Sequence, residues 1–195
     1  MKQAILFTVF IAVFHTSEVY ALPSTHRDSI AAKLDATTTE LLAEIMNVVG
    51  LQPNFELKQA KVLNIEASVS HRKRYILYNP AYITWINNLT KDKWAAMALL
   101  AHEVGHHLNG HTIRRGGSSP RLELEADEFA GFVLHKAGAS LAQAQEVMKY
   151  IAKTEMSKTH PGRMSRMEAI ETGWNRANVA EPVAANTKKQ PVSNN

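Results

Sequence analysis

The sequence predicts an α+β domain that is mostly helical and carries a small β-hairpin. Residues Leu63–Val69 alternate strictly between apolar and polar side chains, and Arg74–Asn79 is rich in aromatic and β-branched residues. Both patterns are typical of strands. The short polar segment Ser70–Lys73 separates them, which predicts a hairpin. Elsewhere apolar residues recur at helical spacing, so helices are expected to make up most of the fold.

The predicted helices begin and end at recognisable signals. In chain order they cover residues 28–49, 80–88, 91–110, 122–136, 141–154 and 162–178. The expected signals are Gly50 after the first helix, Asn79–Pro80 at the start of the second, Thr90 as cap of the third, Gly138 after the fourth, Ser140 as cap of the fifth and the break at His160–Pro161 before the last. The third helix is apolar nearly all round over Trp94–Ala101, which predicts a central, buried position.

The two ends of the chain differ from the middle. Residues 1–21 are similar to a bacterial-type secretory signal peptide, with Lys2 before the apolar run Ala4–Phe14 and small residues before a cleavage point after Ala21. We therefore expect an exported protein, periplasmic or secreted, with no membrane span once the signal is cleaved. An uncleaved membrane anchor is the alternative. The expected domain covers residues 22–178, and the polar residues 179–195 are predicted to form a disordered tail.

Charge and cysteine content restrict the chemistry. The chain has a net charge of +4 and no cysteine, so neither disulfides nor thiolate metal ligands are available. The tight basic clusters are His71–Arg74 and Arg114–Arg115, and neither is interleaved with aromatic residues. We therefore expect no nucleic-acid binding and interpret these residues as solvated loop charges.

The third predicted helix carries the pentad His102-Glu103-Val104-Gly105-His106. Histidines four positions apart differ by about 40° around a helix axis, so their imidazoles can converge on one metal ion. Neutral imidazole is a common zinc ligand. Glu103 is turned by about 100° from His102, where it could act as general base on a water molecule. The pentad therefore predicts a zinc site with His102 and His106 as ligands and Glu103 as catalytic residue.

A catalytic zinc ion needs a third protein ligand, because it keeps one position open. The acidic segment 123–128 lies in the next predicted helix. There Glu123 and Glu125 point about 200° apart, so only one of them can face the metal. His111 is a weaker candidate, because the longer HExxHxxGxxH pattern does not continue in this chain. His107 is expected to form hydrogen bonds rather than to bind metal.

These motifs together resemble the zinc metallopeptidases related to the CAAX prenyl protease and the HtpX membrane protease. Residues Glu123–Asp127 are similar to the ExxAD element of that family, and His160-Pro161 with the later Arg166 is similar to its His-Pro-x4-Arg element. The resemblance spans about residues 64–170. It implies a gluzincin with a zincin-like fold, in which a small sheet lies beside the active-site helix. It further implies that Glu123 is the third zinc ligand and that Asp127 orients a ligating histidine.

The chain also departs from that family. Membrane-embedded relatives have several spanning helices, whereas this chain has none after the signal and resembles the short, soluble minigluzincins. The family's Asn-Ala-x-Ala strand is only partly present, as Asn64-Ile65-Glu66-Ala67, so Asn64 is given no role. His160 is expected to bind the oxyanion or to cover the open metal position, unless it only starts a helix. Arg166 is expected to be either an ion-pair partner or an active-site residue.

The resulting hypothesis is a metalloendopeptidase that holds one Zn²⁺ per chain and hydrolyses peptide bonds of proteins or peptides, in envelope or periplasmic proteolysis or quality control. The alternative is a non-catalytic, zinc-stabilised chaperone-like or assembly factor. Glu103 favours catalysis, because a structural site has no need of it. The strand Tyr75–Tyr78 could be the edge on which an extended peptide pairs, or an ordinary core strand.

Overall fold

The computed structural model describes residues 24–113 and 118–179. The elements follow in the order α1 (Ser24–Val49), β1 (Glu56–Gln59), β2 (Ile65–Ser70), β3 (Lys73–Tyr78), α2 (Pro80–Thr90), α3 (Trp94–Leu108), η1 (His111–Ile113), α4 (Pro120–Lys136), α5 (Leu141–Glu146), α6 (Met148–Ile151) and α7 (Arg163–Val179). The predicted signal peptide, the Arg114–Arg115 cluster and the predicted tail beyond Val179 lie outside the described residues. Within those residues, none of the helices has the length and apolar character needed to cross a membrane.

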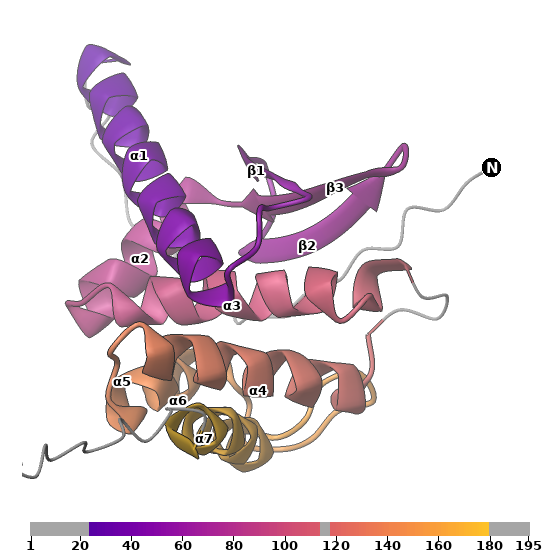
Figure 1. Cartoon of the computed structure of the whole chain (residues 1–195). Coiled ribbons are helices and arrows are strands. Elements are labelled where there is room, and N and C mark those ends of the chain that lie inside the picture. The colour runs from indigo at the N-terminus through magenta and orange to yellow at the C-terminus, as the bar shows by residue number, and fades with distance from the viewer. Residues whose placement is uncertain (1–23, 114–117, 180–195) are drawn as a thin grey trace, which may run out of the picture.

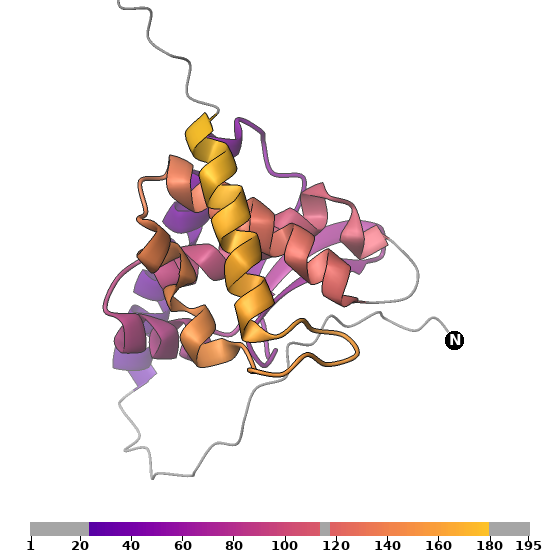
Figure 2. The ribbon, with the colours of Figure 1, turned by 90° about the horizontal axis from the view of Figure 1, so that it is seen from below.

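Helix α3 occupies the middle of the molecule. In Figure 1 the sheet and α1 lie on one side of it, and α4 and α7 lie on the other. The helix is buried from Ala95 to His107 apart from the partly buried Leu99, as its apolar sequence predicts. Seen from below, α7 runs across this face of the molecule, and the segment 152–162 leads into its first turn (Figure 2).

The predicted hairpin is present, and a third strand joins it. Strands β2 and β3 are antiparallel, and the turn residues His71 and Arg72 have φ of 50° and 67°, as two-residue hairpins require. Strand β1 pairs in parallel with β3, giving the order β1-β3-β2. The sequence did not predict β1, because its four residues are mostly exposed and show no apolar alternation. Of the two alternatives for Tyr75–Tyr78, the pairing edge was wrong and the ordinary core strand is correct, because β3 pairs on both sides.

Two predicted helices have different limits. Thr90 does not cap α3: it is the last residue of α2, and its hydroxyl donates to the carbonyl of Ile86. Helix α3 begins only at Trp94, whose amide donates to the Asp92 carboxylate (3.0 Å). The helix predicted over 141–154 is capped by Ser140 but is interrupted at Val147 and ends at Ile151. Val147 keeps helical φ and ψ, so the interruption is local.

Helices α4 and α7 cross at very short distance because glycines lie at the contact. A Cβ atom at Gly131 would lie 2.0 Å from the carbonyl oxygen of Ile170, and one at Gly173 would lie 1.8 Å from that of Glu128. Both contacts are with backbone, which cannot move aside like a side chain. At Gly105 in α3, a Cβ atom would lie 3.3 Å from the Cα of Ala126. These contacts fix α3, α4 and α7 relative to one another.

Candidate metal centre

The residues of the HExxH pentad are buried on α3. His102, Glu103 and His106 are 4%, 5% and 3% exposed. The Nε2 atoms of the two histidines lie 3.0 Å apart, because one turn of helix places both rings on the same face. Polar side chains at this depth are costly unless a strong partner satisfies them.

Glu123 completes a three-residue group from the facing helix α4. One carboxylate oxygen, Oε2, lies 3.4 Å from His102 Nε2, and the other, Oε1, lies 3.6 Å from His106 Nε2. One ligand atom from each of the three residues can be chosen so that all lie within 4.8 Å of one another, and in the described part of the chain no other such group could hold a metal ion. Of the two acidic candidates, Glu123 faces this centre and Glu125 does not.

The donor set fits a zinc ion. Two imidazole nitrogens and one carboxylate form a mixed nitrogen and oxygen set of the kind found in catalytic zinc sites, which leave one position open. Glu123 Oε2 is buried and has no hydrogen-bond partner. A buried carboxylate oxygen without a partner is unfavourable, and a cation held between the three side chains would satisfy it. The Ser118 hydroxyl donates a hydrogen bond to the other oxygen of Glu123.

Asp127 and Arg166 support His102 from behind. His102 Nδ1 lies 2.8 Å from Asp127 Oδ1, so the ring can donate there and turn Nε2 toward the centre. Asp127 also accepts two hydrogen bonds from Arg166, from Nε (2.7 Å) and Nη2 (2.6 Å). All three side chains are buried. Arg166 is thus an ion-pair partner of Asp127 within the site, which joins α7 to α4 and α3.

The carboxylates favour positive charge at the centre. Burial alone would lower the pKa of His102, but Asp127 and Glu123 raise it to about 10. Burial would likewise raise the pKa of Glu123, but contact with His102 and the charges of His102 and His106 lower it. His106 stays neutral, because burial and the neighbouring His102 lower its pKa to about 3. A metal ion binds the unprotonated imidazole and can supply the charge in place of a proton.

Glu103 is held by the sheet. Its Oε2 accepts a hydrogen bond from the backbone amide of Ala67 in β2 (2.6 Å). Burial raises the pKa of Glu103 to about 7, with Glu123 adding to the effect and His102 opposing it. A carboxylate whose pKa lies near neutrality can both accept and return a proton. The sequence did not predict the contact with Ala67, although Ala67 belongs to the strand segment that the family resemblance marked.

His160 is partly buried, and the charges of Glu123, Arg166 and His102 influence its pKa. Its Nδ1 contacts the Thr159 hydroxyl (2.8 Å). The pKa of His160 is lowered, because burial outweighs the opposing effect of the Glu123 charge. It is not part of the three-residue group.

His111 and His107 do not join the group either. His111 is buried and contacts the far side of His106, with 2.9 Å between the two Nδ1 atoms. His107 forms the hydrogen bond expected of it, with the Tyr75 carbonyl (2.9 Å), and stacks on Phe55. The sequence analysis made His111 a weaker ligand candidate, because the HExxHxxGxxH pattern does not continue in this chain, and it expected the helix to run to Gly110. Helix α3 ends at Leu108 instead, and Gly110, with φ of 72°, turns the chain back.

Comparison with protein-family models relates the second half of the described chain to a peptidase family. Residues 116–173 match the family model of Peptidase family M48. The family resemblance predicted from the motifs is thereby confirmed. The M48 match includes Glu123, Asp127, His160 and Arg166, whereas the HExxH pentad lies just before it. No curated protein and no solved structure matches the chain.

Proposed function

We propose that this protein is a zinc-dependent metalloendopeptidase of the M48 type with a zincin-like, gluzincin fold. The observation that carries the proposal is the buried group His102, His106 and Glu123 with Glu103 beside it. A structural zinc site usually has four protein ligands, whereas three ligands with an adjacent carboxylate are typical of hydrolytic sites.

The side chains then have distinct roles. His102, His106 and Glu123 would hold the zinc ion, which when bound would polarise the scissile carbonyl and lower the pKa of a water molecule. Glu103 would be the general base and acid of the reaction, able to accept a proton from the attacking water and return it to the leaving amine. The Ala67 amide fixes the direction of the Glu103 carboxylate. Asp127 and Arg166 hold the His102 ring, and we assign His160, in the loop before α7, to the substrate oxyanion.

The sheet suggests how a substrate is aligned. Strand β2 lies at the end of the strand order β1-β3-β2, so within the described residues no other strand pairs with its outer edge. The Ala67 amide points from this edge to Glu103, which places the edge beside the site. An extended peptide added to β2 would therefore pass the metal centre. This supports protein or peptide substrates, in an unfolded or extended form, and the predicted signal peptide supports a periplasmic or secreted place of action.

Metal removal tests the proposal. The purified protein, treated with chelator and then reloaded with one equivalent of zinc, is incubated with unfolded casein, and new peptide amino termini are identified by mass spectrometry. We expect cleavage with zinc, none after chelation and recovery on reloading. Cleavage that persists in the fully metal-free protein would contradict a zinc-dependent mechanism.

A further inference from the structure

His106 has a polar partner behind it, as His102 does, but of a different kind. His102 Nδ1 faces a carboxylate directly, whereas His106 Nδ1 faces the Nδ1 atom of His111 at 2.9 Å. His111 in turn has Nε2 at 2.8 Å from Glu125 Oε2. Each histidine of the pentad therefore leads to a carboxylate on α4, one directly and the other through a second imidazole.

The Glu125 carboxylate decides which nitrogens donate in the contacts between His106, His111 and Glu125. An ionised carboxylate only accepts hydrogen bonds, so His111 must donate from Nε2 to Glu125. A neutral His111 then has a lone pair on Nδ1, and this atom can only accept. His106 must therefore carry its proton on Nδ1, which leaves the lone pair on Nε2, the atom that faces Glu123 and His102. One carboxylate thus sets the tautomer of two rings.

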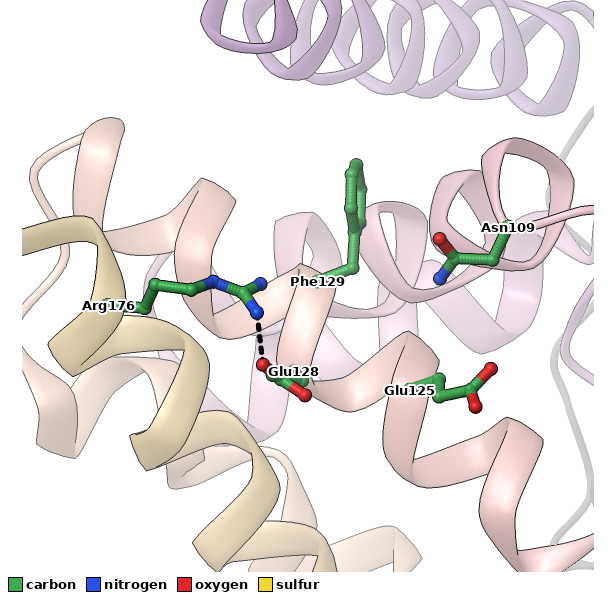
Figure 3. Close-up of a pocket in the computed structure, with 5 residues that line it drawn as sticks. All are labelled: Asn109, Glu125, Glu128, Phe129 and Arg176. Carbon is green, nitrogen blue, oxygen red and sulfur yellow. Dashed lines mark hydrogen bonds and ion pairs between the residues drawn. The ribbon is translucent and has the colours of Figure 1, made fainter. Parts of the chain in front are cut away.

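The backbone places His111 for this contact. Gly110 has φ of 72° and reverses the chain after α3. His111, which has no exposed surface, is the first residue of the short helix η1. The series of side chains His106, His111 and Glu125 ends at the protein surface. There the Glu125 side chain is 36% exposed and pairs with Arg121. Figure 3 shows that Glu125 points away from the Arg176–Glu128 ion pair, although all three residues line the same surface pocket.

We propose that His111 and Glu125 are positioning residues that present His106 Nε2 to the metal, equivalent to the role of Asp127 for His102. The proposal rests on the zinc site of the proposed function. It adds that this site depends on a hydrogen-bonded pair reaching the protein surface at Glu125. Partners of this kind generally change metal affinity by about 10- to 100-fold.

Zinc affinity tests the proposal without relying on activity. The full chain is titrated with zinc against a competing fluorescent chelator, for the wild type and for His111→Phe, Glu125→Ala and Glu128→Ala. We expect His111→Phe to weaken zinc binding about 10- to 100-fold, and Glu125→Ala to weaken it in the same direction but less. Glu128→Ala is the matched control, because Glu128 lies on the same helix, lines the same pocket and pairs with an arginine, but is not part of the His106–His111–Glu125 contacts. His111→Gln, whose carbonyl can still accept from His106, should recover part of the loss.

A second readout is the tautomer of His106 in the zinc-free protein, followed by nitrogen NMR of the imidazole rings. We expect the proton on Nδ1 in the wild type and in Glu128→Ala, and a mixture of tautomers in His111→Phe. Should His111→Phe fail to fold by circular dichroism, Glu125→Ala decides, because its side chain lies at the surface. This proposal alone would be overturned if Glu125→Ala and a folded His111→Phe both kept the zinc affinity and the His106 tautomer of the wild type. A wild-type protein that binds no zinc would overturn it together with the proposed function.

Discussion

At the scale of single residues, Asp127 joins a histidine of the metal centre to a buried arginine. It accepts from His102 and from two nitrogens of Arg166, and it has no exposed surface. Burial would raise its pKa, but the Arg166 and His102 charges lower it. The Asp127 carboxylate therefore has two functions: it orients the His102 ring and it neutralises the buried guanidinium of Arg166.

The variant Asp127→Asn keeps the shape of the side chain and removes this charge. Breaking one side of a buried ion pair typically costs about 3–5 kcal/mol, because the other charge stays buried without compensation. We expect a loss of that size in the free energy of unfolding of the zinc-free protein, measured by urea denaturation. Glu128→Gln, which breaks the exposed pair with Arg176, should cost less than about 1 kcal/mol. Equal losses in the two variants would show that Asp127 has no special structural role.

At the scale of elements, the site depends on how closely three helices approach. Asp127 lies on α4 and Arg166 on α7, and the two side chains meet only because Gly131 and Gly173 let these helices touch through their backbones. Gly105 plays a similar role between α3 and α4. The glycine of the HExxH pentad thus has a packing function in addition to its place in the motif.

Gly131→Ala tests this dependence. The added methyl group would overlap the backbone of Ile170, and such overpacking costs about 1–3 kcal/mol, or more where backbone must shift. We expect a lower midpoint of urea unfolding together with weaker zinc binding, because α7 must move and carries Arg166 with it. Glu171→Ala, at an exposed position of α7, is the control and should leave both unchanged. Unaltered stability in Gly131→Ala would mean that the helices are not in such close contact.

Sequence patterns predicted some elements better than others, for physical reasons. The hairpin and the buried α3 follow from alternation and from a long apolar run, which are local signals. Strand β1 was missed because it is held by backbone pairing with β3 rather than by its own side chains. Thr90 was misread as a cap because a left-handed residue, Lys91, ends α2 directly after it, and the sequence gives no clear sign of that turn.

The candidate metal centre likewise contains residues that the sequence patterns predicted and contacts that they could not predict. Helical spacing brings His102 and His106 together, and the family motif indicated Glu123, all of which the structure places in one group. The contact between His111 and His106 could not be predicted, because it depends on the reversal at Gly110 after the helix ends. The Ala67 amide could not be predicted either, because the approach of β2 to α3 is tertiary.

At the scale of the whole molecule, the chain has no cysteine, so packing and any bound metal must stabilise the fold. A ligand that binds only the folded state stabilises it by mass action, by about 2.7 kcal/mol at 100 times its dissociation constant. We expect zinc at that excess to raise the melting temperature by about 5–10 °C, measured by differential scanning fluorimetry. The shift should vanish in Glu123→Ala. A melting temperature that does not respond to zinc in the wild type would argue against a site joining α3 and α4.

Matched variants distinguish catalysis by Glu103 at a zinc site from a purely structural site. Wild type, Glu103→Gln and the exposed control Glu171→Gln are brought to the same measured zinc content, and their rates of casein cleavage are compared. We expect Glu103→Gln to retain zinc but to lose cleavage by at least about 100-fold, the lower range for general acid–base catalysis, and Glu171→Gln to match the wild type. Cleavage by zinc-loaded Glu103→Gln at the wild-type rate would show that Glu103 is not the catalytic residue.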